Sequence, residues 1–152
     1  MKNVFALMGR SNRGKSQTIR TVVEMLTAKH PTATIEHNQT AKADVRAIVN
    51  INGLKIGVES QSAPKGLRDS LDLFVRTGCD AIICATRTRG ATVDAVSALH
   101  GFEVHWLEQQ EKSKPNEQIL RSLITARGIV EQVEVLIESA EKPPVRRLSA
   151  HA

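Results

Sequence analysis

The stretch GRSNRGKS, from Gly9 to Ser16, restricts the possible folds of this chain more than any other feature of the sequence. An apolar run, VFALM, precedes it, and apolar residues recur at helical spacing after it as far as Lys29. Gly9 and Gly14 allow the backbone to turn so that consecutive amide N–H groups point inward. Because a new helix adds the positive end of its dipole, we expect an anion-binding turn between a buried strand and a helix.

The remainder of the chain alternates between strand and helix patterns. Two alternating apolar runs joined by Asn52-Gly53 predict a β-hairpin over residues 45–59. Further elements are predicted as short strands over 32–36, 80–85 and 102–107, and as helices that begin near Leu67 and Gly90. This order predicts an α/β domain with a mostly parallel central sheet, helices on both faces and a hairpin at one edge.

A long helix is expected over residues 115–140. Its apolar stripe repeats every three or four residues and consists of Ile119, Leu123, Ala126, Val130, Val133, Ile137 and Ala140. Such a stripe fits a helix lying on the sheet of its own subunit, and it also fits the seam of a homodimer. We expect residues 1–141 to form a single domain and residues 142–152 a flexible basic tail.

The composition restricts the partners of the protein. A net charge of +5 and a pI of about 9.6 suit an anionic ligand or nucleic acid, but only 3% of the residues are aromatic and base-stacking platforms are disfavoured. No window of 18 uninterrupted apolar residues occurs, and the N-terminal apolar run lacks a cleavage site, so no membrane association and a cytoplasmic location are expected. Cys79 and Cys84 are expected to be buried free thiols on opposite faces of one strand.

GRSNRGKS fits the pattern G-x-x-x-x-G-K-[ST] completely, and in this respect the chain resembles the P-loop NTPase superfamily with its Walker A motif. The resemblance implies a nucleotide bound with Mg²⁺, with Lys15 on the β and γ phosphates and Ser16 as a metal ligand. The residues expected to bind the nucleotide are Gly9, Arg10, Ser11, Asn12, Arg13, Gly14, Lys15, Ser16 and Gln17.

Three further side chains are candidates for the chemistry, beside Lys15. Glu59 ends the second arm of the hairpin, where a carboxylate would bind the metal with Ser16 or act as a base; a plain strand-end carboxylate is the alternative. Arg87 and Arg89 follow a buried strand and look like the shortened lid of a small P-loop kinase, where guanidinium groups neutralise phosphoryl oxygens. Surface solubility is the competing interpretation of both arginines.

The motifs D-x-x-G and N-K-x-D of guanine-specific members are absent, since ESQS and ATRT stand in the corresponding places. ATP is therefore the expected nucleotide. We expect an ATP-dependent phosphotransferase of the small kinase type, with a small-molecule phosphoryl acceptor, or an ATPase. The alternative is a nucleotide-state switch or ATPase subunit that acts on a protein or nucleic-acid partner.

Overall fold

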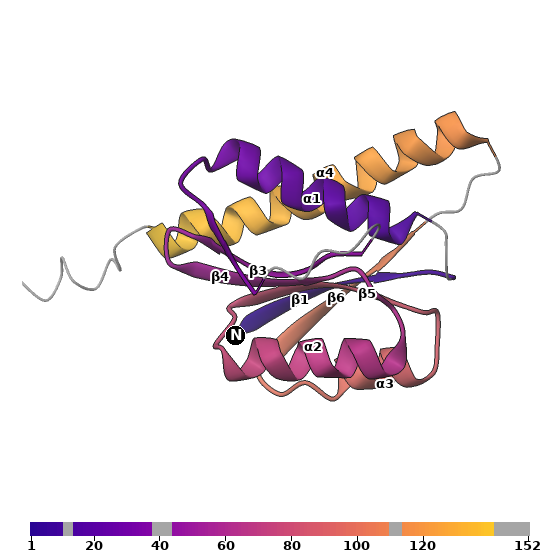
Figure 1. Ribbon diagram of the computed structural model, residues 1–152, viewed down its shortest axis with the longest axis horizontal. Helices are drawn as coiled ribbons and strands as arrows, with labels where there is room; N and C mark the ends of the chain where they lie inside the picture. The colour runs from indigo at the N-terminus through magenta and orange to yellow at the C-terminus, as the bar shows by residue number, and fades with distance from the viewer. Residues whose placement is uncertain (11–13, 38–43, 110–113, 142–152) are drawn as a thin grey trace, which may run out of the picture.

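The computed structural model describes residues 1–10, 14–37, 44–109 and 114–141. A six-stranded sheet lies between two layers of helices (Figure 1). The strands are β1 (Lys2–Met8), β2 (Thr34–Glu36), β3 (Arg46–Ile51), β4 (Leu54–Glu59), β5 (Ala81–Thr86) and β6 (Phe102–Glu108). The helices are α1 (Lys15–Lys29), α2 (Pro64–Arg76), α3 (Ala91–Ser97) and α4 (Pro115–Glu141).

The sheet is mixed, so the expectation of a mostly parallel sheet is wrong. Its strand order is β2-β3-β4-β5-β1-β6, in which β4, β5, β1 and β6 run parallel while β3 is antiparallel to both of its neighbours. The predicted turn explains the antiparallel pairing of β3 with β4. Asn52 and Gly53 have φ values of 52° and 87° and join the two strands directly. The second antiparallel pairing joins β2 to β3, so that β2 forms the edge of the sheet where the hairpin was expected.

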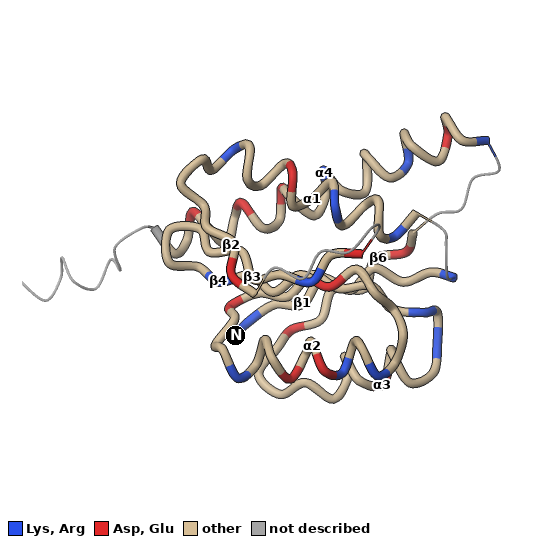
Figure 2. Tube along the Cα trace, in the orientation of Figure 1, with Lys and Arg blue, Asp and Glu red and all other residues tan. Residues whose placement is uncertain are grey.

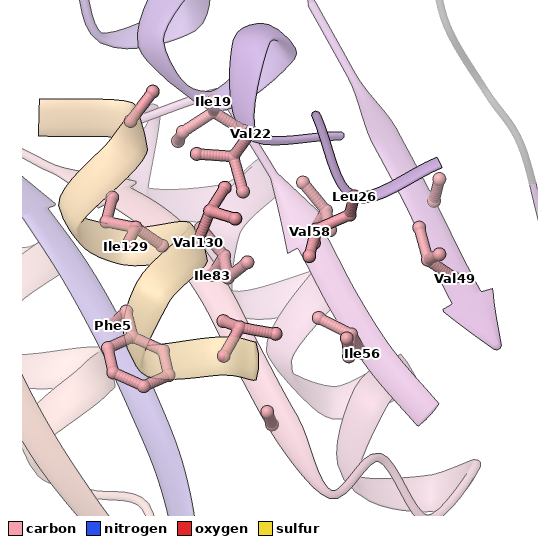
Figure 3. Packing of buried hydrophobic residues seen from close by; sticks show 14 of the residues in the cluster. Phe5, Ile19, Val22, Leu26, Val49, Ile56, Val58, Ile83, Ile129 and Val130 are labelled. Carbon is pink, nitrogen blue, oxygen red and sulfur yellow. The ribbon is translucent and has the colours of Figure 1, made fainter. Parts of the chain in front are cut away.

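Alternating side chains of the sheet divide the core into two clusters. Phe5 and Leu7 of β1 belong to the cluster covered by α1 and α4, to which Ile19 and Val130 contribute (Figure 3). The next side chains along β1, among them Val4, point to the opposite face and pack beneath α2 and α3. Figure 1 shows these two helical layers on either side of the strands. The prediction of helices on both faces is confirmed.

Helix α4 packs on its own sheet over only part of its length. Its buried apolar side chains are Ala126, Ile129, Val130, Val133 and Ile137. Earlier in the helix, Ile119 and Leu123 of the predicted stripe are 56% and 43% exposed. The first turns of α4 extend past the body of the domain in Figure 1. Of the predicted stripe, the residues from Ala126 to Ile137 therefore serve the core of the subunit, while Ile119 and Leu123 before them and Ala140 after them are exposed.

Two other expectations concern the thiols and the tail. Cys79 and Cys84 are both free and fully buried, and burial, with a smaller contribution from Glu59, raises the pKa of Cys84 to about 12. The predicted tail, 142–152, lies outside the described residues. Within the described ranges, no helix combines the length and apolar character needed to cross a membrane.

Gly57 allows α2 to approach β4, which gives a test of the packing. A Cβ atom at this position would lie 2.4 Å from Cγ of the buried Phe74. We expect Gly57→Ala to lower the free energy of unfolding by about 1–3 kcal/mol, the usual cost of overpacking, as measured by urea denaturation. Gly128→Ala is the control, because no atom lies within 4 Å of its added Cβ. Equal effects of the two substitutions would contradict the close approach.

Candidate functional site

The loops after three parallel strands meet at one edge of the sheet. The amide of Gly9, after β1, donates to the carbonyl of Thr86 at the end of β5 (3.1 Å). The amide of Gln109, after β6, donates to the carbonyl of Met8 (2.8 Å). Helix α1 begins at this same edge (Figure 1). Residues 9–16 are called the glycine loop below, and those that the structure describes, Gly9, Arg10 and 14–16, lie at the edge where ligands of α/β sheets gather. Ser11, Asn12 and Arg13 lie outside the described residues.

Gly14 and Lys15 form the transition from the glycine loop into α1. Gly14 has a φ of 86°, a left-handed conformation that favours glycine. The Lys15 side chain turns back over the loop, and its Nζ donates to the carbonyl oxygens of Gly9 (2.5 Å) and Thr86 (2.6 Å). Lys15 is only 4% exposed, and burial, with a smaller contribution from the charge of Arg87, lowers its pKa to about 8. The lysine thus places an ammonium group between the ends of β1 and β5.

Ser16 lies beside a carboxylate that the sequence analysis did not select. Its Oγ donates to Oδ1 of Asp44 at 3.4 Å. Asp44 comes just before β3, and β3 runs antiparallel to β4, so the beginning of β3 lies at the edge where β4 ends. Val45 fixes this point of the chain, because its amide donates to Oγ of Ser60 (2.7 Å) and its carbonyl accepts from the Ser60 amide (2.9 Å). Serine and aspartate oxygens are ligands that Mg²⁺ accepts.

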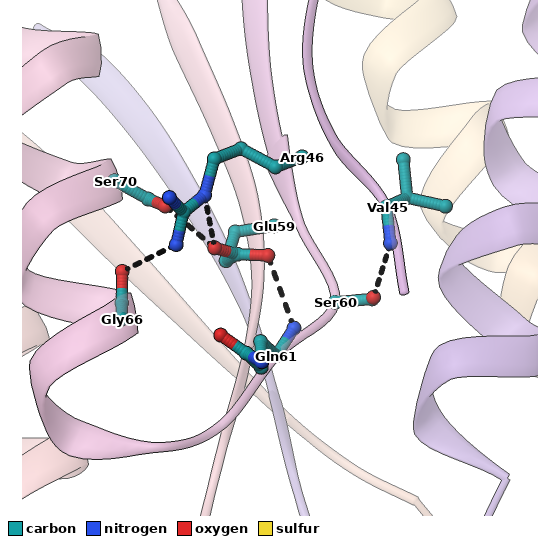
Figure 4. A network of polar contacts seen from close by, with 7 residues as sticks. All are labelled: Val45, Arg46, Glu59, Ser60, Gln61, Gly66 and Ser70. Atoms are coloured by element: carbon teal, nitrogen blue, oxygen red, sulfur yellow. Dashed lines mark hydrogen bonds and ion pairs between the residues drawn. The ribbon is translucent and has the colours of Figure 1, made fainter. Parts of the chain in front are cut away.

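Glu59 is buried in a different group of contacts (Figure 4). It is 1% exposed, and its Oε1 accepts from Nε of Arg46 (2.8 Å) and Oγ of Ser70 (2.5 Å). The amide of Gln61 donates to Oε2 at 3.1 Å. Arg46 also donates from Nη2 to the carbonyl of Gly66 (3.1 Å). These contacts tie the end of β4 to β3 and α2, and neither Lys15 nor Ser16 is among the described partners of Glu59.

The two arginines of the predicted lid differ in their placement. Both are exposed in the loop between β5 and α3, which is marked in blue near the glycine-loop edge in Figure 2. Arg87 lies close enough for its charge to act on Lys15, and its amide donates to Oγ1 of Thr92 (2.9 Å). No described contact joins Arg89 to the glycine loop. Arg10 in the glycine loop and Gln17 in the first turn of α1 are both exposed.

A polar cluster connects the glycine loop to the first turns of α4, and the sequence analysis missed it. Gln109 is 4% exposed; its Oε1 accepts from Oγ1 of Thr18 (2.9 Å), and its Nε2 donates to Oγ of Ser122 (3.4 Å). A Cβ atom added to Gly14 would lie 2.9 Å from Nε2 of Gln118 and 3.2 Å from Oγ of Ser122. The start of α4 therefore lies directly against the glycine loop. The position of Gln109 just after a predicted strand was the one available signal.

A hollow of about 540 Å³ lies at the opposite edge of the sheet, where the parallel strands begin. Its lining includes Lys2, Asp80 and His100. No described residue of the glycine loop lines it, so it is separate from the contacts of Lys15. Asp80 lies in this lining, directly before β5, and its Oδ2 accepts a hydrogen bond from the Lys55 amide at 2.9 Å.

The pKa of Lys15 can be measured by NMR titration of ¹³C-labelled lysine in protein free of metal and nucleotide. Because the value in the folded protein lies below the ordinary 10.5, we expect the ammonium form to dominate only below about pH 8. Arg87→Ala should move the midpoint upward by removing a repelling charge. Arg89→Ala, the matched control, should leave it in place. A midpoint near 10.5 in the unmodified protein would show that Lys15 is solvated.

Glu59 gives a prediction about stability. Glu59→Gln leaves Arg46 without its counter-charge, and we expect the free energy of unfolding to fall by about 3 kcal/mol, the low end for a broken buried pair because Arg46 partly reaches solvent. The exposed Glu24→Gln is the control and should change it by less than about 0.5 kcal/mol. Denaturant titrations measure both. A stable Glu59→Gln protein would indicate that the network contributes nothing to the fold.

No protein-family model, no curated protein and no solved structure matches this chain. The chemistry open to the site therefore has to be judged from its own residues: an ammonium group, a serine hydroxyl paired with a carboxylate, and an arginine at one edge of an α/β sheet.

Proposed function

We propose that the glycine loop binds a nucleoside triphosphate together with Mg²⁺, and that the protein is an ATP-dependent phosphotransferase or ATPase. The observation that carries this proposal is that the first two residues of α1 supply both groups: Lys15 donates to the carbonyl of Gly9, and Ser16 donates to the carboxylate of Asp44. Phosphate binding requires a cation and backbone donors, and the metal requires oxygen ligands beside them. The resemblance of the loop to Walker A supports the same ligand. ATP follows from the missing guanine motifs, and a cytoplasmic location belongs to the same proposal.

Each described residue of the loop has a separate task in this proposal. Gly14 allows the chain to enter α1 with its amides directed at the phosphates, and Lys15 neutralises the phosphate chain. Ser16 and Asp44 would hold the metal, since hydroxyl and carboxylate oxygens fit the preference of Mg²⁺. Bound there, Mg²⁺ supplies charge neutralisation on the phosphate oxygens. Asp44 takes the place predicted for Glu59, whose carboxylate already accepts three hydrogen bonds.

The reaction is the transfer of the γ-phosphoryl group to the oxygen of water or of a small hydroxylated acceptor. The bond from the γ-phosphorus to the β–γ bridging oxygen breaks, a bond to the acceptor oxygen forms, ADP leaves, and the acceptor proton passes to solvent or to a carboxylate. Positioning and electrostatics provide most of the rate in this chemistry. Arg87 is the residue best placed to stabilise the transferring group, because its charge already acts on Lys15. Arg89 is its predicted partner in the same loop.

The polar cluster of Gln109 and Ser122 favours a second candidate function. Because α4 contacts Gly14 through this cluster, occupancy of the glycine loop could alter the position of the first turns of α4. The protein would then act as a nucleotide-state switch or ATPase subunit for a protein or nucleic-acid partner. Transfer of labelled phosphate to a metabolite pool supports the phosphotransferase, whereas release to water alone favours the ATPase or switch.

Binding of a fluorescent ATP analogue with Mg²⁺ or with EDTA tests the shared core of both candidates. We expect Lys15→Ala to weaken binding about 10–100-fold under both conditions, because it removes a charged hydrogen-bond donor. Asp44→Asn should remove most of the gain that Mg²⁺ provides and leave metal-free binding intact. Glu59→Gln, studied below its unfolding transition, should retain that gain.

The opposite pattern would identify Glu59, and not Asp44, as the metal ligand. In that case Glu59→Gln would lose the gain in nucleotide affinity that Mg²⁺ provides, and Asp44→Asn would keep it. Unchanged binding by Lys15→Ala, with circular dichroism confirming the fold, would remove the nucleotide proposal altogether.

A further inference from the structure

The first turns of α4 carry a second face that points away from the core. Leu120 and Ile124 are 59% and 50% exposed, while Ser122 and Ala126, in the same turns, are buried. Advancing by about 100° per residue places Leu120 and Ile124 roughly opposite the buried side chains. The four large apolar side chains exposed in this segment are Ile119, Leu120, Leu123 and Ile124. A soluble domain rarely leaves such a cluster on one short helical segment without a partner.

Leu120 and Ile124 are flanked along α4 by two residues of opposite charge. Glu117 precedes Leu120 by three residues, and Arg127 follows Ile124 by three, and both charged residues are exposed. The spacing 117, 120, 124, 127 is the three-and-four alternation of a coiled-coil seam, with Glu117 and Ile124 in the a positions and Leu120 and Arg127 in the d positions. This seam differs from the stripe that enters the core, because it lies on the other side of α4.

We infer that two copies of this chain pair through antiparallel α4 helices, related by a two-fold axis beside residue 122. In an antiparallel pair each a residue faces a d residue, so residue i lies opposite residue 244 − i. Leu120 then faces Ile124 of the second copy, and Glu117 faces Arg127 at both ends of the overlap. The apolar contacts lie at the centre, and each end is closed by opposite charges.

Charge complementarity is the reason to assign the face to a second copy and not to an unrelated partner. The order acidic, apolar, apolar, basic is self-complementary only when the second helix runs in the reverse direction, as a two-fold axis perpendicular to the helix requires. In a parallel pair Glu117 would face Glu117 and Arg127 would face Arg127, and like charges at both ends would oppose association. The overlap covers about three turns, so we expect a dissociation constant in the micromolar range.

Sedimentation velocity of the nucleotide-free protein, in a series reaching about 100 µM, tests the pairing independently of any nucleotide. We expect a monomer–dimer equilibrium that Glu117→Arg and Arg127→Glu each weaken by about tenfold, because like charges then meet at both ends. The double variant should restore association to within about threefold of the original. Glu138→Arg is the matched control, since this exposed residue lies beyond the overlap and should leave the equilibrium unchanged.

All four variants alter exposed side chains, so circular dichroism and thermal unfolding at low concentration should match the unmodified protein. A monomer across the whole series would overturn the inference. A dimer that both single charge reversals leave intact, or that the double variant fails to restore, would overturn the antiparallel register. Leu120→Ser offers an independent check, because it should abolish association without reversing a charge.

Discussion

The pairing of β1 with β5 on one side and β6 on the other determines where the glycine loop and Lys15 lie. These two parallel pairings bring the ends of three strands to one edge, where the carbonyls of Met8 and Thr86 accept hydrogen bonds from the loops. The glycine loop can turn into α1 only because that edge is fixed. Packing follows from the same strand, since alternate side chains of β1 enter both core clusters. A shift in the register of β1 would separate Lys15 from Thr86 and exchange the two faces of the core.

Local patterns in the sequence were sufficient to predict the elements. The apolar run ending at Gly9, the Asn52-Gly53 turn and the helical spacing after Pro115 each depend on neighbouring residues, and the structure places a strand, a hairpin and a long helix there. The pairing of the edge strand β2 was not predictable in the same way. The pairing of β2 with β3 joins residues separated by a long connection, and three residues of weak pattern give no information about that contact. The predicted mostly parallel sheet failed for this reason.

The carboxylate near Ser16 shows a related limit of sequence reasoning. The prediction of Glu59 came from the carboxyl ends of the strands, because ligand-binding residues of a parallel sheet lie there. Asp44 stands at the beginning of a strand, and only the reversed direction of β3 brings that beginning to the same edge. The contacts of Gln109 with Thr18 and Ser122 were equally hidden, because they join residues far apart in sequence whose types indicate no particular function. Whether Glu59 is a metal ligand remains a prediction; its observed partners are Arg46, Ser70 and Gln61.

The two hydrogen bonds of Lys15 to the carbonyls of Gly9 and Thr86 have a consequence for selectivity. Any ligand that draws the ammonium group away must replace both contacts, each of which is of the stronger, charge-assisted kind. A small monovalent anion offers too few acceptors to do so, whereas a chain of phosphates offers several oxygens at once. Under the proposed function, the lysine would therefore set a threshold that weakly binding anions do not pass. Discrimination against simple ions would then arise from the two hydrogen bonds that Lys15 has to break, in addition to the contacts that the ligand forms.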